Sequence, residues 1–224
     1  MVYIKTYDEP VYNVKEVMRY AGAVKPDEAT LNLFNTSSEE LKGKLSYRVW
    51  WSEFPVKFKD GSLDLGFAET KSRDLYKNLR DCKSIVLFAA TIGIYLDRMI
   101  LKYKSLSPSK ALMLQAIGAE RIESLCDVFN HEIKAHAKEN GKYTKPRFSP
   151  GYGDLDISFQ REIFKALDCP RKIGLSLNES LLMSPTKSVT AIIGITESLP
   201  SLTKEKCAAC KKYDCNFREP TDEH

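Results

Sequence analysis

The chain has 224 residues, of which 43% are hydrophobic and 29% are charged, enough for one large domain or two small ones with a sizeable core. Its net charge of +4 is far from the basic balance of a nucleic-acid-binding protein, so we expect no nucleic-acid partner. No basic start precedes an apolar segment, and no apolar run is long enough to span a bilayer. These features predict a cytoplasmic protein without a signal peptide or membrane contact, whose six cysteines are thiols or metal ligands rather than disulfides.

The N-terminal part of the sequence predicts a short strand followed by two helices. Residues 2–4 suit a strand, and apolar residues recur at helical spacing from residue 14 until Gly22 ends the helix. A second helix is expected to begin at residues 26–28, because proline suits the first helical turn and acidic side chains suit its positive dipole end.

β-structure is predicted next. Apolar and polar residues alternate between residues 46 and 58, and Pro55 within this run favours an edge strand or a bulge. A turn at residues 60–61 and the apolar residues 63–67 complete an antiparallel hairpin. Residues 84–92 form a nearly continuous apolar run, which is typical of a central strand buried on both faces.

Helices are expected on either side of this central strand. Ser72 suits the N-cap of a short helix before it, and residues 95–106 predict a helix after it. Ser107-Pro108 then begins the longest helix, which runs to about residue 138 because apolar residues recur there at helical steps. The acidic residues on its other faces are expected to be mostly solvated: Glu120, Glu123 and Asp127.

The C-terminal half completes a mixed architecture. Residues 159–167 predict a short helix that Pro170 ends. Residues 175–183 and 188–195 predict two strands joined by a turn. Because helices and strands mix without a regular βαβ alternation, the predicted fold class is α+β: a mixed, largely antiparallel twisted sheet with flanking helices, including one long helix.

One segment fits neither a helix nor a strand: Arg147-Phe148-Ser149-Pro150-Gly151-Tyr152-Gly153-Asp154. Proline fixes its own φ angle, and glycine permits backbone angles and close approaches that are closed to other residues. The cation at one end, the carboxylate at the other and the exposed backbone between them can hold a small zwitterion. A rigid loop between two helices accounts for the same residue types equally well.

This segment resembles the loop of arginine, proline, glycine and tyrosine in the activation (reactivation) domain of cobalamin (vitamin B12)-dependent methionine synthase. A second block is similar to the same family and follows in the family's order and spacing: Gly174-Leu175-Ser176-Leu177-Asn178-Glu179-Ser180, then Met183-Ser184-Pro185 and Ser188-Val189-Thr190. The resemblance is good from about residue 119 to residue 195. It implies an activation-like domain over residues 1–200 and a cysteine-containing tail over residues 201–224.

The resemblance implies a stand-alone reactivation factor that binds S-adenosylmethionine. In this family the domain docks against the corrinoid-carrying module and couples the reduction of inert cob(II)alamin to methyl transfer from the sulfonium. We therefore expect a component of the methionine synthase (methyltransferase) system, in methionine biosynthesis, that supports reductive methylation in trans. Its implied partners are cobalamin-binding methionine synthase modules and a flavodoxin- or ferredoxin-type electron donor. Because its work is placement of the methyl group, no catalytic residue is assigned.

The resemblance also implies the ligand contacts. Arg147 would pair with the methionine carboxylate, and Glu123 would place negative potential near the sulfonium. Backbone groups around Ser149 and Gly151 would meet the adenine or the ribose, and Tyr152 would face the corrin. The implied S-adenosylmethionine site comprises Arg147, Ser149, Pro150, Gly151, Tyr152 and Glu123.

Two departures from the family pattern leave other functions open. The family's N-terminal acidic residue, which takes the ligand's amino group, has no clear counterpart in this sequence. Isoleucines also replace the aromatic residues that follow the second block: Ile192, Ile193 and Ile195. These departures favour a module that docks a corrinoid or redox partner without binding S-adenosylmethionine. An activator of another corrinoid methyltransferase is a further alternative.

The tail contains three cysteines at C-x2-C-x4-C spacing: Cys207, Cys210 and Cys215. Thiolates at this spacing can share one metal, and the neighbouring lysines and arginine would lower their pKa values. The three thiolates can hold a [4Fe–4S] cluster with one position left for another ligand, or they can contribute to a zinc site. A tail of free thiols is the alternative to either metal.

Overall fold

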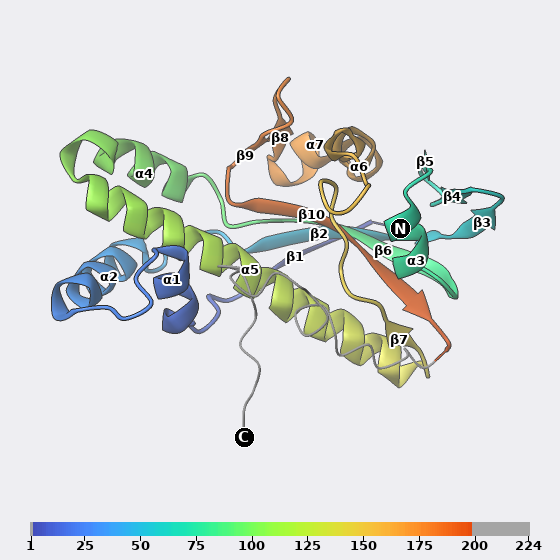
Figure 1. Ribbon diagram of the computed structural model, residues 1–224, viewed down its shortest axis with the longest axis horizontal. Helices are drawn as coiled ribbons and strands as arrows, with labels where there is room; N and C mark the ends of the chain where they lie inside the picture. Colours follow the sequence, from blue (N-terminus) through green and yellow to red (C-terminus); the bar gives the residue numbers. More distant parts are fainter. Residues whose placement is uncertain (1, 199–224) are drawn as a thin grey trace.

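A computed structural model of the chain describes residues 2–198, and its centre is a five-stranded sheet (Figure 1). From one edge to the other, the strands are β1 (Val2–Thr6), β2 (Arg48–Pro55), β6 (Cys82–Thr91), β10 (Ser188–Thr196) and β7 (Tyr143–Thr144). Each neighbouring pair runs antiparallel. This sheet and the long helix beside it confirm the α+β class predicted from the sequence.

The sheet separates two hydrophobic cores because the side chains of a strand alternate between its two faces. In β6, Val86, Phe88 and Ala90 enter the first core. The neighbours Ile85 and Leu87 enter the second core. All of these side chains are almost fully buried, which explains the continuous apolar run and confirms the predicted central strand.

Helices cover both faces of the sheet (Figure 1). The first core lies beneath α1 (Val14–Tyr20), α2 (Glu28–Leu41), α4 (Tyr95–Leu106) and α5 (Pro108–Glu139). The second core lies beneath α3 (Arg73–Asn78), α6 (Gln160–Leu167), which the 3-10 turn η1 (Ile157–Phe159) precedes, and α7 (Cys169–Ile173). Helix α5 has 32 residues and crosses one face of the sheet from the α4 side to β7. It therefore contacts both ends of the fold.

The predicted hairpin is only partly correct. Strand β2 lies between β1 and β6, so Pro55 does not belong to an edge strand. Proline is tolerated there because Pro55 is the last residue of β2, where the chain leaves the sheet. The turn at Asp60 and Gly61 does form, but in a separate sheet made of β3 (Lys57–Lys59), β4 (Ser62–Asp64) and β5 (Glu69–Thr70).

The C-terminal elements differ from their predictions at two places. Pro170 does not end a helix but lies in the first turn of α7, directly after Asp168 turns the chain with a positive φ of 49°. Residues 175–183 do not form one strand; only the short strands β8 (Ser176–Leu177) and β9 (Met183–Ser184) pair there. The long helix and β10 match their predictions.

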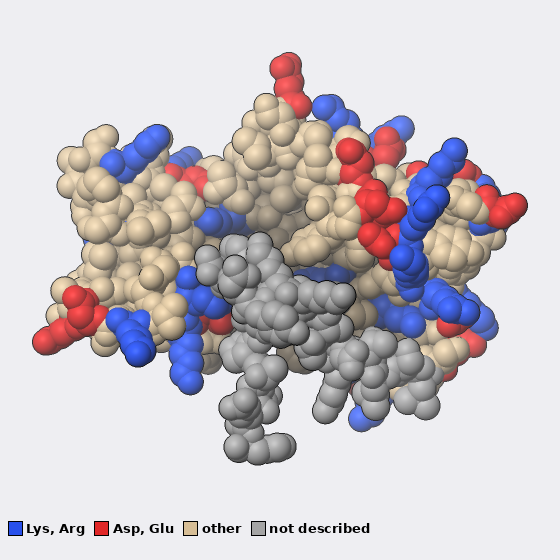
Figure 2. Space-filling model, viewed as in Figure 1, with Lys and Arg blue, Asp and Glu red and all other residues tan. Residues whose placement is uncertain are grey.

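The described surface carries charges of both signs. Acidic and basic side chains lie interspersed on the face shown in Figure 2. Within residues 2–198, no helix combines the length and the apolar character that crossing a membrane requires.

Candidate functional site

The segment at residues 147–154 is a compact loop that begins on the central sheet. Phe148 and Ile192 of β10 exchange two backbone hydrogen bonds of 2.9 Å, which fix the start of the loop against the strand. The chain then turns back, and the N–H of Tyr152 donates to the carbonyl of Ser149 at 3.1 Å. The loop is therefore held by its own backbone as well as by the sheet.

Two glycines give the loop its shape. Gly151 and Gly153 have φ angles of 91° and 53°, in the left-handed region that other residues adopt only with strain. A Cβ atom added at Gly153 would lie 2.5 Å from a carboxylate oxygen of Asp74, too close for nonbonded atoms. A side chain at position 153 would therefore adopt an unfavourable φ angle and displace Asp74 in the first turn of α3.

Asp154 closes the loop onto the N-terminus of α3. Its carboxylate accepts hydrogen bonds from the Ser72 hydroxyl at 2.5 Å and from the backbone N–H groups of Arg73 and Asp74 at 2.8 and 3.1 Å. The hydrogen bond from Ser72 has the largest effect and those from the backbone add to it, and together they hold the pKa of Asp154 below its ordinary value. The expectation that this carboxylate serves as the acidic end of a zwitterion site is therefore wrong, because Asp154 caps a helix.

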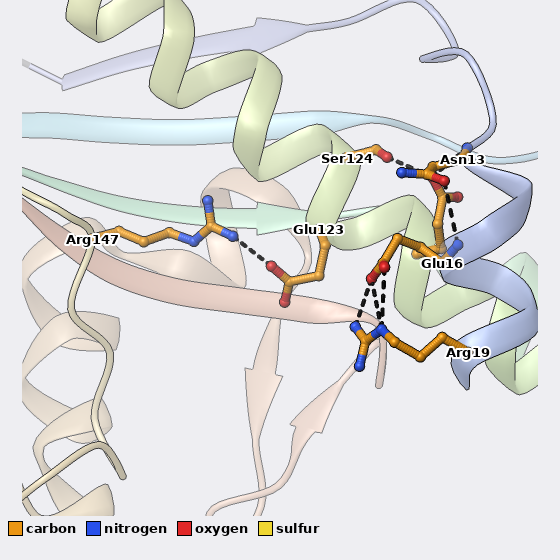
Figure 3. Close-up of polar contacts among 7 residues, drawn as sticks. Asn13, Glu16, Arg19, Glu123, Ser124 and Arg147 are labelled. Carbon is orange, nitrogen blue, oxygen red and sulfur yellow. Dashed lines mark hydrogen bonds and ion pairs between the residues drawn. The ribbon is translucent and has the colours of Figure 1, made fainter. Parts of the chain in front are cut away.

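Arg147 extends from the opposite end of the loop to the long helix (Figure 3). Its Nη2 atom lies 2.6 Å from Oε2 of Glu123, and its Nη1 atom lies 2.6 Å from Oδ1 of Asp127. The two carboxylates are four residues apart, so they lie one above the other on one face of α5. Burial disfavours the charged form of Arg147 and by itself would lower its pKa. Hydrogen bonding to Asp127 and the nearby negative charges outweigh this effect and raise the pKa above the ordinary value. The structure thus brings two of the predicted site residues, Arg147 and Glu123, into direct contact.

Helix α1 adds charged groups that sequence reasoning missed. Glu16 and Arg19 form an ion pair of 2.6 Å, and the Arg19 guanidinium lies 4.4 Å from the centre of the Tyr20 ring. Burial raises the pKa of Tyr20, and the negative charge of Glu123 adds to this effect together with that of Glu16. These groups therefore lie on the same side of α5 as Glu123 (Figure 3). Their only sequence signal is an acid and a base three residues apart on a helix.

A buried ion pair fixes α1 against α5. Arg121 is fully buried, and its Nε atom donates to the carboxylate of Glu120 at 2.5 Å. Arg121 also donates to the carbonyls of Pro10 and Val11, while Glu120 accepts from the backbone N–H of Asn13 at 3.0 Å. Glu120 is thus an exception to the expectation that most acidic residues of α5 are solvated, because its carboxylate completes the contact between α5 and the segment before α1.

The remaining predicted residues differ in exposure. Pro150 is buried, Ser149 is half-buried, and Tyr152 is 69% exposed with its ring edge toward Phe148.

Two cavities lie near the loop and near α1. One of about 430 Å³ adjoins Asp154. The other, of about 670 Å³, is lined by Glu16 and Arg19 among other residues of the α1 region.

The cysteines of the described residues do not form a metal site. Cys82, Cys126 and Cys169 are buried, and burial raises the pKa of Cys82 to about 11 and that of Cys169 to about 12. Between residues 2 and 198, no group of three or more His, Cys, Asp or Glu side chains could hold a metal ion. The predicted ligands lie outside the described residues: Cys207, Cys210 and Cys215.

Comparison with known proteins decides the family. The family described as the activation domain of vitamin B12-dependent methionine synthase matches residues 74–201. The chain belongs to this family. Among solved structures, the MetH reactivation domain bound to AdoHcy is similar with a TM-score of 0.64 and 14% sequence identity, covering 90% of this chain and 80% of that chain. At this identity, the likeness establishes a shared fold. No curated protein gives a match.

The helix cap formed by Asp154 predicts a pH-dependent contribution to stability. Because the folded-state pKa of Asp154 lies below the ordinary value of 3.8, the cap stabilises the fold fully above that value and less as the pH falls through the lower folded-state pKa. We expect Asp154→Asn to lower the free energy of unfolding at pH 7 and to lose this effect as the pH falls through the folded-state pKa of Asp154. Urea denaturation of both proteins at several pH values measures the difference. A difference that does not change with pH would contradict the assignment of Asp154 as an ionised cap.

The buried pair of Glu120 and Arg121 predicts a large effect on stability. Arg121→Met leaves Glu120 buried without a counter-ion, which costs about 3–5 kcal/mol of unfolding free energy. The double variant Arg121→Met with Glu120→Gln removes the uncompensated charge and is expected to recover part of this loss. Chemical denaturation of the single and double variants compares them. Equal instability of the two would show that the charge pair is not what holds the N-terminal segment.

Proposed function

We propose that this activation domain binds S-adenosylmethionine at the loop of residues 147–154 and supports reductive methylation of cob(II)alamin held by a methionine synthase in trans. The proposal rests on one observation. In a chain of this family, Arg147 of the loop and Glu123 of α5 meet at 2.6 Å, so that a cation and an anion are available within one small region. A zwitterionic ligand needs both charges at short range.

Arg147 is the residue we propose for the carboxylate of the ligand. A guanidinium group offers parallel N–H donors that match the two oxygens of a carboxylate, and this geometry fixes orientation as well as affinity. Arg147 is 27% exposed at its side chain, so it is reachable from solvent and still partly shielded from it. The backbone of Ser149, Pro150 and Gly151 would then face the nucleoside part.

Glu16 is the residue we propose for the ammonium group of the ligand. The sequence showed no acidic residue for this end, whereas the fold brings α1 to the same side of α5 as Glu123. Glu16 is 34% exposed at its side chain and borders the cavity of about 670 Å³. Its pair with Arg19 is exposed enough to exchange for a ligand ammonium group at little cost.

The charges around this region favour a cationic sulfur. Three carboxylates, those of Glu16, Glu123 and Asp127, face two guanidinium groups, those of Arg19 and Arg147. The excess negative charge on rigid helices provides a fixed field of the sign that a sulfonium needs. S-adenosylmethionine supplies an activated methyl group, and the residues of this chain hold it in place rather than perform acid–base chemistry.

Tyr152 is the residue we propose for contact with the partner. Its ring is mostly exposed and rests against Phe148, which is fixed to the sheet. An exposed aromatic on a rigid base can pack on a flat macrocycle carried by another protein. We further propose that residues 1–200 form the domain and that Cys207, Cys210 and Cys215 of the following tail bind an iron–sulfur cluster or zinc.

A docking module that does not bind S-adenosylmethionine is the second candidate. Ile192 and Ile193, which stand where the family has aromatic residues, are buried in the two hydrophobic cores and do not line an open site. A module of this kind would dock its partner through Tyr152 and the surrounding surface, without using the charges of Arg147 and Glu123. Binding of the partner that is insensitive to S-adenosylmethionine would favour this second function.

Calorimetry with S-adenosylmethionine tests the leading function. We expect the wild-type chain to bind and Arg147→Ala to lose about ten- to a hundredfold in affinity, because hydrogen bonds to charged groups contribute about 1.5–3 kcal/mol. Arg98→Ala, which removes the same charge from an exposed position on α4, serves as the control and should bind like the wild type. If none of the three proteins binds S-adenosylmethionine, the ligand assignment is contradicted.

A further inference from the structure

The two terminal nitrogens of Arg147 already bind carboxylates of this chain. Nη1 contacts Asp127 and Nη2 contacts Glu123, each at 2.6 Å. A carboxylate that docks side by side on a guanidinium uses two of its nitrogens, at least one of which is terminal. A ligand carboxylate can therefore take this position on Arg147 only by displacing or weakening one of the two internal contacts.

Asp127 is the contact that is easier to displace. Its side chain is 59% exposed, whereas that of Glu123 is 44% exposed. Among the described residues, the hydrogen bonds and ion pairs of the Asp127 side chain involve Arg147 alone. Glu123 has a second neighbour, because its charge acts on Tyr20 of α1. An exposed ion pair with one partner contributes little to stability. When it breaks, hydration of the separated groups replaces it at low cost.

We propose that Asp127 is an internal competitor for the ligand carboxylate at Arg147, and that it thereby limits the affinity of the site. The inference rests on the proposed function, in which Arg147 receives the carboxylate of S-adenosylmethionine. On binding, the ligand carboxylate takes the place of Asp127 on Nη1 and uses the second N–H of Nη2, while Glu123 keeps the other N–H of Nη2 and holds the guanidinium toward α5. Asp127 then lies near a second negative charge, which opposes binding further.

A positioning role for Asp127 would change the ligand affinity in the opposite direction when Asp127 is removed. If Asp127 served to position Arg147 for the ligand, its removal would leave the guanidinium less ordered and would weaken binding. The geometry favours competition because Glu123, one turn earlier on α5, already supplies a positioning contact of the same length. The sign of the change in affinity therefore separates the two roles.

Calorimetry with S-adenosylhomocysteine and 5′-methylthioadenosine tests this proposal. Both ligands have a neutral sulfur, and only S-adenosylhomocysteine carries the amino-acid carboxylate. We expect Asp127→Asn to bind S-adenosylhomocysteine about three- to tenfold more tightly than the wild type, as relief of one exposed charge repulsion implies. Affinity for 5′-methylthioadenosine should stay unchanged.

Glu139→Gln is the matched control, because it removes one negative charge from the same helix at a side chain that is 76% exposed. It should leave both affinities unchanged. If the wild type binds S-adenosylhomocysteine and Asp127→Asn binds it equally or less tightly, the competition is refuted while the proposed function stands. An equal gain for both ligands, or the same gain in the control, also refutes it. If neither the wild type nor Asp127→Asn binds S-adenosylhomocysteine, the proposed function fails together with this inference.

Discussion

The packing of helix α5 across the sheet is the constraint on which the candidate site depends. The helix is held by the first hydrophobic core, into which Leu114, Ile117, Leu125 and Phe129 project. From this fixed axis, Glu120 and Arg121 secure the segment that leads into α1, and Glu123 and Asp127 secure the loop through Arg147. These four residues lie on consecutive turns of one helix. Two segments far apart in the sequence therefore meet along a short stretch of α5, where their charges can act together.

The loop has an accessible part and a part that is used for the fold. Its first part, with Arg147, faces α5 and remains partly accessible, and Tyr152 projects from its turn into solvent. Its last part is used for the fold, because Gly153 passes closely by α3 and Asp154 caps that helix. The loop is thus tied at both ends, to β10 and to α3, and its accessible groups are presented by a fixed backbone.

Much of the fold was predictable from local patterns. The apolar run of β6 and the long periodic stretch of α5 identified the two elements that carry most of the core, because burial on both faces or on one stripe leaves a clear pattern. The assignment of β2 failed at Pro55, because alternation does not reveal when a strand leaves one sheet and the next strand joins another. Pro170 was misread because the same residue suits a helix end and a helix start.

Local sequence pattern identified the loop of the candidate site, and the resemblance to the family identified Glu123. The loop from Arg147 to Tyr152 stands out because its proline and glycines break every regular pattern. The contribution of Glu16 and Arg19 depends on how α1 packs on α5, and that packing depends on the buried contacts of Arg121. A buried arginine in a helix has the same sequence signature as a solvated one, so this anchor could not be recognised without the fold.

The most direct measurement of the proposed function is a reconstitution with defined components. A cob(II)alamin-carrying methionine synthase module, a one-electron reductant and S-adenosylmethionine are combined with and without this chain, and the visible spectrum follows the cobalamin. The account predicts conversion to methylcobalamin that requires both the chain and S-adenosylmethionine, and that is strongly reduced with Arg147→Ala. A cob(II)alamin spectrum that stays unchanged with the wild-type chain, or conversion that Arg147→Ala supports equally well, would contradict it.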